Sequence, residues 1–248
     1  MKYGFMTFSY PEVGIADVVG NAARAGYTGI EVRIGAGHGH GLEIDAPGAR
    51  RAEAVGIAGD AGIELYAIAT SFKLAVDPLD EDTARATLRL AADLGAKVVR
   101  VFGGAFADAG IDAATARARL VEGLSRFGAL ARAETGGSVT IALESHDVWT
   151  DPDELAAVLD EVTGGSPDVP AGLNWDAFHI VRTTGQGVAE HFPTIARHVK
   201  HVHVHDGYQR DGKPVLAPIG EGVVDHGEQL RALASIGYDG YLMGEWIH

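Results

Sequence analysis

The chain has 248 residues, 46% of them hydrophobic, which is enough to bury a sizeable core and fits one large domain or two small ones. Its formal net charge of -14 argues against a nucleic-acid partner, because nucleic-acid binders need a surface rich in lysine and arginine. The chain has no cysteine, which excludes disulfides and thiolate metal sites, and no run of eighteen apolar residues that would predict a membrane span.

Short runs rich in Val, Ile, Leu and aromatic residues alternate with Ala-rich stretches of helical period along the whole chain. The first run is a strand and not a signal peptide, which together with the absence of cysteine predicts a cytoplasmic protein. The predicted strands are Lys2–Ser9, Gly29–Ile34, Ile63–Thr70, Lys97–Phe102, Ser138–Glu144, Ala171–Asp176, Val199–Asp206 and Gly240–Trp246. The predicted helices lie near 14–26, 47–62, 80–95, 112–135, 151–163, 186–198 and 226–237.

Repeated alternation of strand and helix is typical of an α/β protein with a parallel sheet, and eight strands predict a closed (β/α)8 TIM barrel. No G-x-G-x-x-G follows the first strand, which disfavours a dinucleotide-binding sheet. Because no linker or break in composition interrupts the pattern, we expect residues 1–248 to form a single TIM-barrel domain. The last outer helix is expected to be absent, and we predict a homo-oligomer, a dimer or tetramer, that covers the open flank.

Inward side chains at the carboxyl ends of TIM-barrel strands form the active site, and four consecutive strands carry an ionisable residue in that phase. These residues are Glu144 in VTIALE, Asp176 in LNWD, a histidine of HVHVHD, and Glu245 in YLMGE. Three converging carboxylates repel one another unless a cation lies between them, so the pattern predicts a divalent metal. An oxygen-rich set with one imidazole suits Mn²⁺, Mg²⁺ or Co²⁺, with Zn²⁺ as a further option. The histidine is one of three that alternate with valines, His201, His203 and His205.

The chain resembles the xylose isomerase-like TIM barrel superfamily, and within it the sugar phosphate isomerase/epimerase group. That group includes ketose 3-epimerases, hydroxypyruvate isomerases and inosose dehydratases. The resemblance lies in the segments AARAGYTGIEVR, AADLGAKVVRVFGG, ALESHD, NWDAFH, HVHVHD, PIGEGVVD and GYDGYLMGEW. It implies one divalent cation, Mn²⁺ first, bound by Glu144, Asp176, His203 and Glu245. His203 is selected because Asp206 completes an H-x-x-D motif.

The resemblance also implies an activity, in which Glu144 and Glu245 exchange protons on the two faces of a carbon next to a ketone. We therefore expect an isomerase or epimerase of a small sugar or keto-sugar that acts through an enediolate. His179, the histidine of D-x-x-H, would contact substrate hydroxyls. His146 is an alternative acid or base. Because dehydratases of the group combine such a metal site with histidines, a lyase acting by β-elimination on a keto-sugar or keto-inositol is the alternative.

Two departures from the ketose epimerases prevent the sugar from being identified. Thr150 stands where the ketose epimerases have a substrate-binding acid. Gln209, with Arg210 beside it, stands where they have an arginine. Arg210 is therefore the expected substrate-binding arginine. Less favoured functions are an apurinic endonuclease-like enzyme, which the net charge opposes, and a non-catalytic sugar-binding protein.

The other polar residues near strand ends are given alternative or structural roles. Lys73 is expected either to bind a substrate oxygen or to extend along the rim, and His205 is a possible substrate contact. His38 and His40 either line the mouth or lie in a flexible, solvated loop. The residues assigned to structural roles are His201, Glu221, and an internal ion-pair network of Glu31, Arg33 and Arg100.

Overall fold

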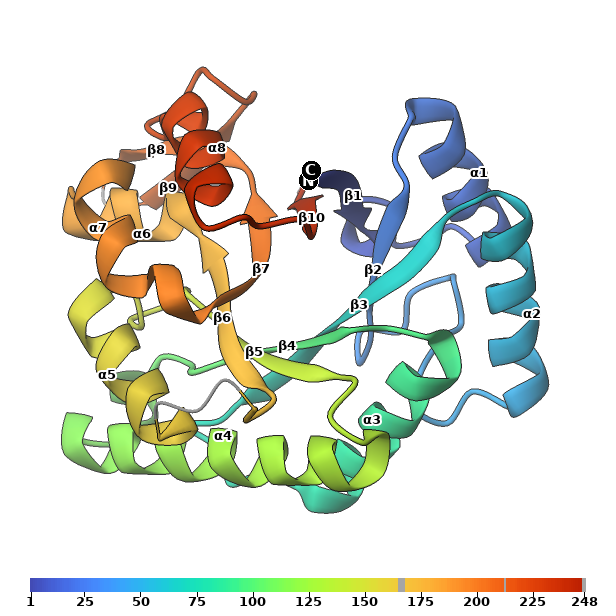
Figure 1. Cartoon of the computed structure of the whole chain (residues 1–248), viewed down its shortest axis with the longest axis horizontal. Helices are drawn as coiled ribbons and strands as arrows, with labels where there is room; N and C mark the ends of the chain where they lie inside the picture. Colours follow the sequence, from blue (N-terminus) through green and yellow to red (C-terminus); the bar gives the residue numbers. More distant parts are fainter. Residues whose placement is uncertain (165–167, 212, 247–248) are drawn as a thin grey trace.

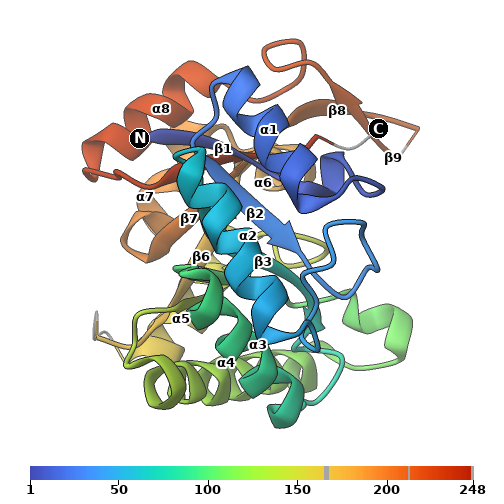
Figure 2. The ribbon, with the colours of Figure 1, turned by 90° about the vertical axis from the view of Figure 1, so that its right-hand side faces the viewer.

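A computed structural model describes residues 1–164, 168–211 and 213–246 of the protein. Eight parallel strands close into a barrel in the order β1-β10-β7-β6-β5-β4-β3-β2, with helices around it (Figures 1 and 2). This confirms the predicted TIM barrel and all eight strands. The barrel strands are β1 (Lys2–Met6), β2 (Gly29–Arg33), β3 (Glu64–Lys73), β4 (Val98–Phe102), β5 (Thr140–Glu144), β6 (Ala171–Asp176), β7 (Val199–Val204) and β10 (Tyr241–Gly244).

One α-helix follows each of the first five strands, two follow β6, and one precedes β10. The helices are α1 (Ile15–Ala25), α2 (Gly48–Asp60), α3 (Glu81–Leu94), α4 (Ala113–Thr135), α5 (Pro152–Thr163), α6 (Ala177–Thr184), α7 (Val188–Ile195) and α8 (His226–Ser235). Three short 3-10 helices are η1 (Thr7–Ser9), η2 (Phe106–Ala109) and η3 (Ala196–His198). Within the described residues no helix follows β10, and α1 and α8 flank β1 and β10 there (Figure 1).

The helix ends form where the sequence predicts them. Asp80 accepts hydrogen bonds from backbone N–H groups at the start of α3, and Asp151 does so at the start of α5. Gly26, directly after α1, has φ of 80°, a left-handed conformation that glycine adopts without steric cost. These local signals fix where each helix stops and the next strand begins.

The two faces of the strands separate as the predicted phases require. Ile141 and Leu143 of β5 point outward and belong to the large core between barrel and helices. Inside the barrel, Ala67, Val98 and Ala142 form a small separate apolar cluster. Ala142 lies one inward position before Glu144, so the polar residues at the barrel mouth rest on an apolar floor.

The sequence did not predict a hairpin after β7 or a helix directly after β6. An antiparallel hairpin of β8 (Asp206–Arg210) and β9 (Lys213–Ala217) follows β7, and α6 follows β6 directly. Eight α-helices therefore accompany the barrel in the described part of the chain, although none follows β10 there. Among the described residues, no helix is both long enough and apolar enough to cross a membrane.

Candidate metal centre and active site

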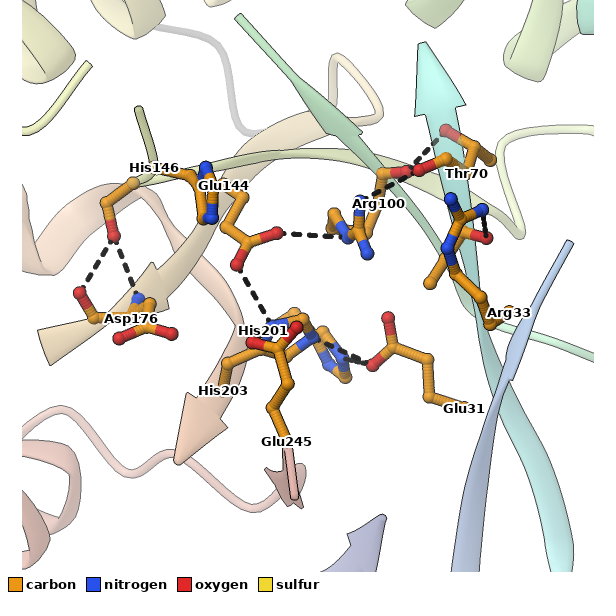
Figure 3. A network of polar contacts seen from close by, with 12 residues as sticks. Glu31, Arg33, Thr70, Arg100, Glu144, His146, Asp176, His201, His203 and Glu245 are labelled. Carbon is orange, nitrogen blue, oxygen red and sulfur yellow. Dashed lines mark hydrogen bonds and ion pairs between the residues drawn. The ribbon is translucent and has the colours of Figure 1, made fainter. Parts of the chain in front are cut away.

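The structure brings together the four residues proposed as metal ligands. Their strands β5, β6, β7 and β10 are neighbours in the barrel, and each strand carries its residue at or near its carboxyl end. One potential ligand atom of each residue lies within 4.8 Å of the others in the set Glu144, Asp176, His203 and Glu245. The adjacent strand ends thus concentrate three carboxylates and one imidazole in a small volume (Figure 3).

Burial makes this concentration of charge costly unless it is compensated. Glu144, Asp176 and His203 are at most 1% exposed, and the Glu245 side chain is 13% exposed. Oε2 of Glu245 is buried and accepts no hydrogen bond from any residue that the structure describes. This oxygen lies 3.6 Å from Nδ1 of His203 but accepts no hydrogen bond from it, which is unfavourable for a buried carboxylate, and a divalent cation would supply a closer contact. The donor set therefore fits a divalent cation that prefers oxygen and imidazole ligands.

His203 lies between carboxylates on both sides of its ring. Nδ1 is 3.2 Å from Oε1 of Glu144 and 3.6 Å from Oε2 of Glu245, while Nε2 is 3.0 Å from Oε2 of Glu31. Burial lowers the pKa of His203, but the charges of Glu31 and Glu144 outweigh it and hold that pKa well above its usual value. The carboxylates on both sides thus favour the positively charged form of the His203 ring.

Glu144 has a second cationic partner, which sequence reasoning did not assign to it. Nε of Arg100 approaches Oε2 of Glu144 to 3.0 Å, and both side chains are almost fully buried. Burial raises the pKa of Glu144, but Arg100 and His203 together hold it well below the usual range. Glu144 is thus kept as a carboxylate with one oxygen held by Arg100.

Asp176 has several roles at once. One carboxylate oxygen accepts from the backbone N–H of His179 and caps α6, and the other is 2.7 Å from Nε2 of His205. Burial opposes ionisation of Asp176, but His205 and His179 lower its pKa to about 2. Burial likewise lowers the pKa of His205, but Asp176 raises it more, to about 9. His205 also lines a cavity of about 240 Å³ beside Glu245, so contact with a substrate is compatible with its pairing to Asp176.

His179 and His146 lie next to each other at the mouth, with ring centroids 4.2 Å apart. Nδ1 of His179 accepts from Nε of Arg182 at 3.0 Å, which leaves the ring proton on Nε2. Burial lowers the pKa of His179 to about 4, so the ring is neutral. The sequence did not point to Arg182, because α6 was not predicted. Had that helix been predicted, the spacing of three residues would have placed Arg182 and His179 on the same helix face.

The imidazole of His146 contacts the carboxylate of Asp147, the next residue in the chain. Its Nδ1 is 2.9 Å from Oδ1 of Asp147, whose φ of 53° places a non-glycine residue in the left-handed region. Burial lowers the pKa of His146, but Asp147 and Glu144 raise it above its usual value. One potential ligand atom of His146 lies within 4.8 Å of those of Glu144 and His179, so His146 belongs to the same polar group at the mouth.

In the structure, neither Lys73 nor Arg210 contacts the four candidate ligands. Lys73 ends β3, is exposed, and lines a separate cavity of about 320 Å³ with Ser71 and Asp77. Arg210 is exposed in β8, where it contacts Tyr208, and none of its contacts with described residues reaches the four ligands. Both remain predicted substrate contacts.

Other predicted roles are confirmed or corrected. His40 is fully buried and bonds the carbonyl of Arg33 and the N–H of Leu42, so it neither lines the mouth nor lies in a solvated loop. His38 is partly exposed and packs against the rings of Phe8 and His40.

The predicted internal network takes a different form, because Glu31, Arg33 and Arg100 make no ion pair with one another. Glu31 instead contacts His201 and His203, Arg100 contacts Glu144, and Arg33 donates to Ser71. His201 is fully buried, as expected of a structural residue.

Asp206, the second residue of the H-x-x-D motif, organises the loop that precedes α8. Its carboxylate accepts from four backbone N–H groups, those of Gly207, Gly220, Gly222 and Val224. A Cβ at Gly222 would lie 2.0 Å from Oδ1 of Asp206, so only glycine fits there. Glu221 is exposed within this loop. The motif thus joins a candidate ligand to a structural aspartate.

A family model described as "Xylose isomerase-like TIM barrel" matches residues 19–248, so the chain belongs to that family. Comparison with curated protein sequences gives no significant match. Among solved structures, a D-psicose 3-epimerase crystallised with D-fructose aligns with a TM-score of 0.76 and 19% identity, over 99% of this chain and 84% of the other.

Two further solved structures show the same fold. The probable 3-DHS dehydratase AsbF from Bacillus anthracis has a TM-score of 0.74 and 18% identity, over 100% of this chain and 93% of that one. The IOLI protein with a bound zinc atom has a TM-score of 0.73 and 17% identity, over 100% and 90%.

Proposed function

We propose that this member of the xylose isomerase-like TIM barrel family is a divalent-metal-dependent isomerase or epimerase of a small sugar or keto-sugar, with Mn²⁺ as the expected ion. The convergence of three carboxylates and one imidazole within 4.8 Å, at the ends of four adjacent strands, carries the proposal. The D-psicose 3-epimerase among the structural neighbours supports the same substrate class, and the zinc atom in the IOLI protein supports a metal in this fold.

A divalent cation held by Glu144, Asp176, His203 and Glu245 would polarise a substrate carbonyl and so acidify the neighbouring C–H bond. Proton transfer then falls to the two glutamates, which come from opposite ends of the row β5-β6-β7-β10. Glu245 is the more accessible, with 13% exposure against 1% for Glu144. Arg100 contacts Oε2 of Glu144, whereas Oε1 faces Nδ1 of His203 at 3.2 Å. One carboxylate removes the proton and the other returns a proton to the carbon skeleton.

His179 is suited to hold a substrate oxygen in place. Its ring is neutral, and its proton lies on Nε2 because Nδ1 accepts from Arg182. A neutral imidazole N–H donates to a hydroxyl or carbonyl oxygen without adding a charge that would have to be desolvated. His179 therefore orients the substrate and the glutamates carry protons.

The arrangement of His146 favours a lyase as the second candidate. Its pKa is raised, and its ring lies beside His179 and within reach of Glu144. In a β-elimination a glutamate would take the C–H proton, the C–O bond would break, and the His146 imidazolium would protonate the departing hydroxyl to give water. The 3-DHS dehydratase among the structural neighbours is consistent with this chemistry.

Solvent deuterium distinguishes the two reactions. The Mn²⁺-loaded protein is incubated in D₂O with a panel of ketoses and keto-inositols, and the products are analysed by mass spectrometry and NMR. We expect deuterium in recovered substrate and in an isomer of equal composition. Loss of water without reversible exchange would establish the lyase instead.

Matched variants assign the exchange to the site. Glu245→Gln should abolish it, whereas Glu64→Gln, at the opposite end of the barrel, should not, because Glu64 contacts Lys2 and no candidate ligand. If sugars bind but none undergoes exchange or elimination, the protein is a non-catalytic sugar-binding protein.

A further inference from the structure

We propose that Glu31 and Arg100 are positioning residues that orient two of the metal-binding side chains from within the barrel. The inference rests on the proposed function, because it treats His203 and Glu144 as ligands. Glu31 comes from β2 and Arg100 from β4, and neither belongs to the set of four. Both are buried, with exposures of 0% and 2%.

Glu31 fixes the ring of His203. Its Oε2 is 3.0 Å from Nε2 of His203, so that nitrogen donates a proton and Nδ1 faces Glu144 and Glu245. A metal-binding histidine whose other N–H donates to a carboxylate is held in one tautomer and one orientation, and becomes a more basic ligand. Nε2 of His201 lies 2.8 Å from the same oxygen and holds Glu31 itself in place.

Arg100 fixes the carboxylate of Glu144 in a comparable way. Its Nε lies 3.0 Å from Oε2 of Glu144, and its Nη1 donates to the carbonyl of Thr70 at 2.8 Å. The guanidinium also lies 4.0 Å from the ring centroid of Phe102. The contacts with Thr70 and Phe102 hold this planar cation rigidly beside Oε2 of Glu144, and Oε1 is left directed toward His203.

The contacts form one continuous buried row from Arg100 through Glu144, His203 and Glu31 to His201 (Figure 3). Two of the four candidate ligands are thereby held in position by partners outside the set of four. Holding ligands in place in advance reduces the ordering that binding requires, so these partners should contribute to metal affinity. A role only in folding would not predict this.

Metal affinity of the full-length chain tests the proposal. Binding of Mn²⁺ alone is measured by calorimetry, and the absorption spectrum of bound Co²⁺ reports coordination geometry. The variants are Glu31→Gln, Glu31→Asp, which keeps the charge but withdraws it by one methylene, and Arg100→Lys, which keeps the charge but loses the planar fork. Asn174→Ala is the control, because Asn174 is buried beside Glu144 and His201 in strand register, yet its side chain bonds no described residue.

We expect each Glu31 and Arg100 variant to bind Mn²⁺ roughly ten- to a hundredfold more weakly, with an altered Co²⁺ spectrum, while Asn174→Ala binds as the wild type does. Circular dichroism and melting identify the folded variants, and three substitutions at two sites keep the test possible if one fails to fold. Wild-type affinity and spectrum in the folded variants would overturn the proposal, and so would equal weakening in Asn174→Ala. If the wild type binds neither ion, the proposed function itself fails.

Discussion

Arg182 donates to Nδ1 of His179 through Nε at 3.0 Å, with Nη2 at 2.9 Å from the same atom. The pair comes from successive turns of α6, the short helix that Asp176 caps. One helix thus connects a candidate metal ligand, a candidate substrate donor and the residue that fixes its tautomer.

Loss of Arg182 should weaken substrate use without removing the metal. Arg182→Met deprives His179 of its partner, and hydrogen bonds of charged donors contribute about 1.5–3 kcal/mol, so we expect kcat/KM to fall by about tenfold or more. Steady-state kinetics with the active sugar measure the effect, and Mn²⁺ affinity should be unchanged. Arg197→Met is the control, because Arg197 contacts Asp160 and lies before β7 at the opposite end of the barrel. Equal kinetics of wild type and Arg182→Met would contradict the assignment.

Metal removal should destabilise the folded protein. A ligand at a hundredfold excess over its Kd stabilises the native state by about 2.7 kcal/mol. For a chain of this length each kcal/mol shifts Tm by roughly 2–4 °C, so chelation should lower Tm by about 5–10 °C. Scanning calorimetry with and without Mn²⁺ measures the shift, which Glu245→Gln should abolish and Glu64→Gln should retain. A Tm that is the same with and without Mn²⁺ would contradict metal binding at this site.

His146 should matter little if the glutamates carry the protons. In that case His146→Gln should lower kcat by less than about tenfold, whereas removal of an acid or base costs roughly 10²–10⁴-fold. Turnover of the active sugar by Glu245→Gln and His146→Gln provides the comparison. A larger loss of kcat in His146→Gln than in Glu245→Gln would contradict the glutamate mechanism and favour the lyase.

Asp206 should stabilise the fold in a pH-dependent manner. Burial raises its pKa, but bonds from four backbone N–H groups lower it below the usual value. Because the folded pKa is depressed, this stabilisation is present above the unfolded pKa of about 3.9 and is lost as pH falls through the folded pKa. We expect Asp206→Asn to lower the free energy of unfolding by about 2 kcal/mol at pH 5 and by less at pH 3.

Urea unfolding at the two pH values measures this difference. Asp225→Asn is the matched control, because Asp225 caps α8 at an exposed site where asparagine caps equally well. An effect of Asp206→Asn that is equal at pH 5 and pH 3 would show that the charge of Asp206 is not the stabilising feature.

Strand phase explains why the four candidate ligands could be predicted. Side chains alternate between the two faces of a strand, so the apolar Ile141 and Leu143 identify the outward face and assign Glu144 to the inward one. The same reasoning places Asp176 and Glu245 and turns all three histidines of HVHVHD inward. The choice of His203 among the three came from the family resemblance, through the H-x-x-D motif.

The contacts around the ligands could not be predicted in this way, because they depend on register between distant strands. Glu31 meets His203 across 172 positions of sequence, and the inward phase of β2 does not identify its partner. Helix α6 was missed because its cap, Asp176, ends a strand and was already assigned to the metal. The hairpin β8–β9 was missed because its residues lack a clear alternation of apolar and polar side chains.

The most direct test of the metal site is anomalous diffraction from crystals soaked in Mn²⁺. We predict one strong peak bonded to a carboxylate oxygen of each of Glu144, Asp176 and Glu245 and to Nδ1 of His203, with Nε2 of His203 still on Glu31. A fully soaked crystal with no peak among these four residues, or with their side chains splayed apart, would contradict it.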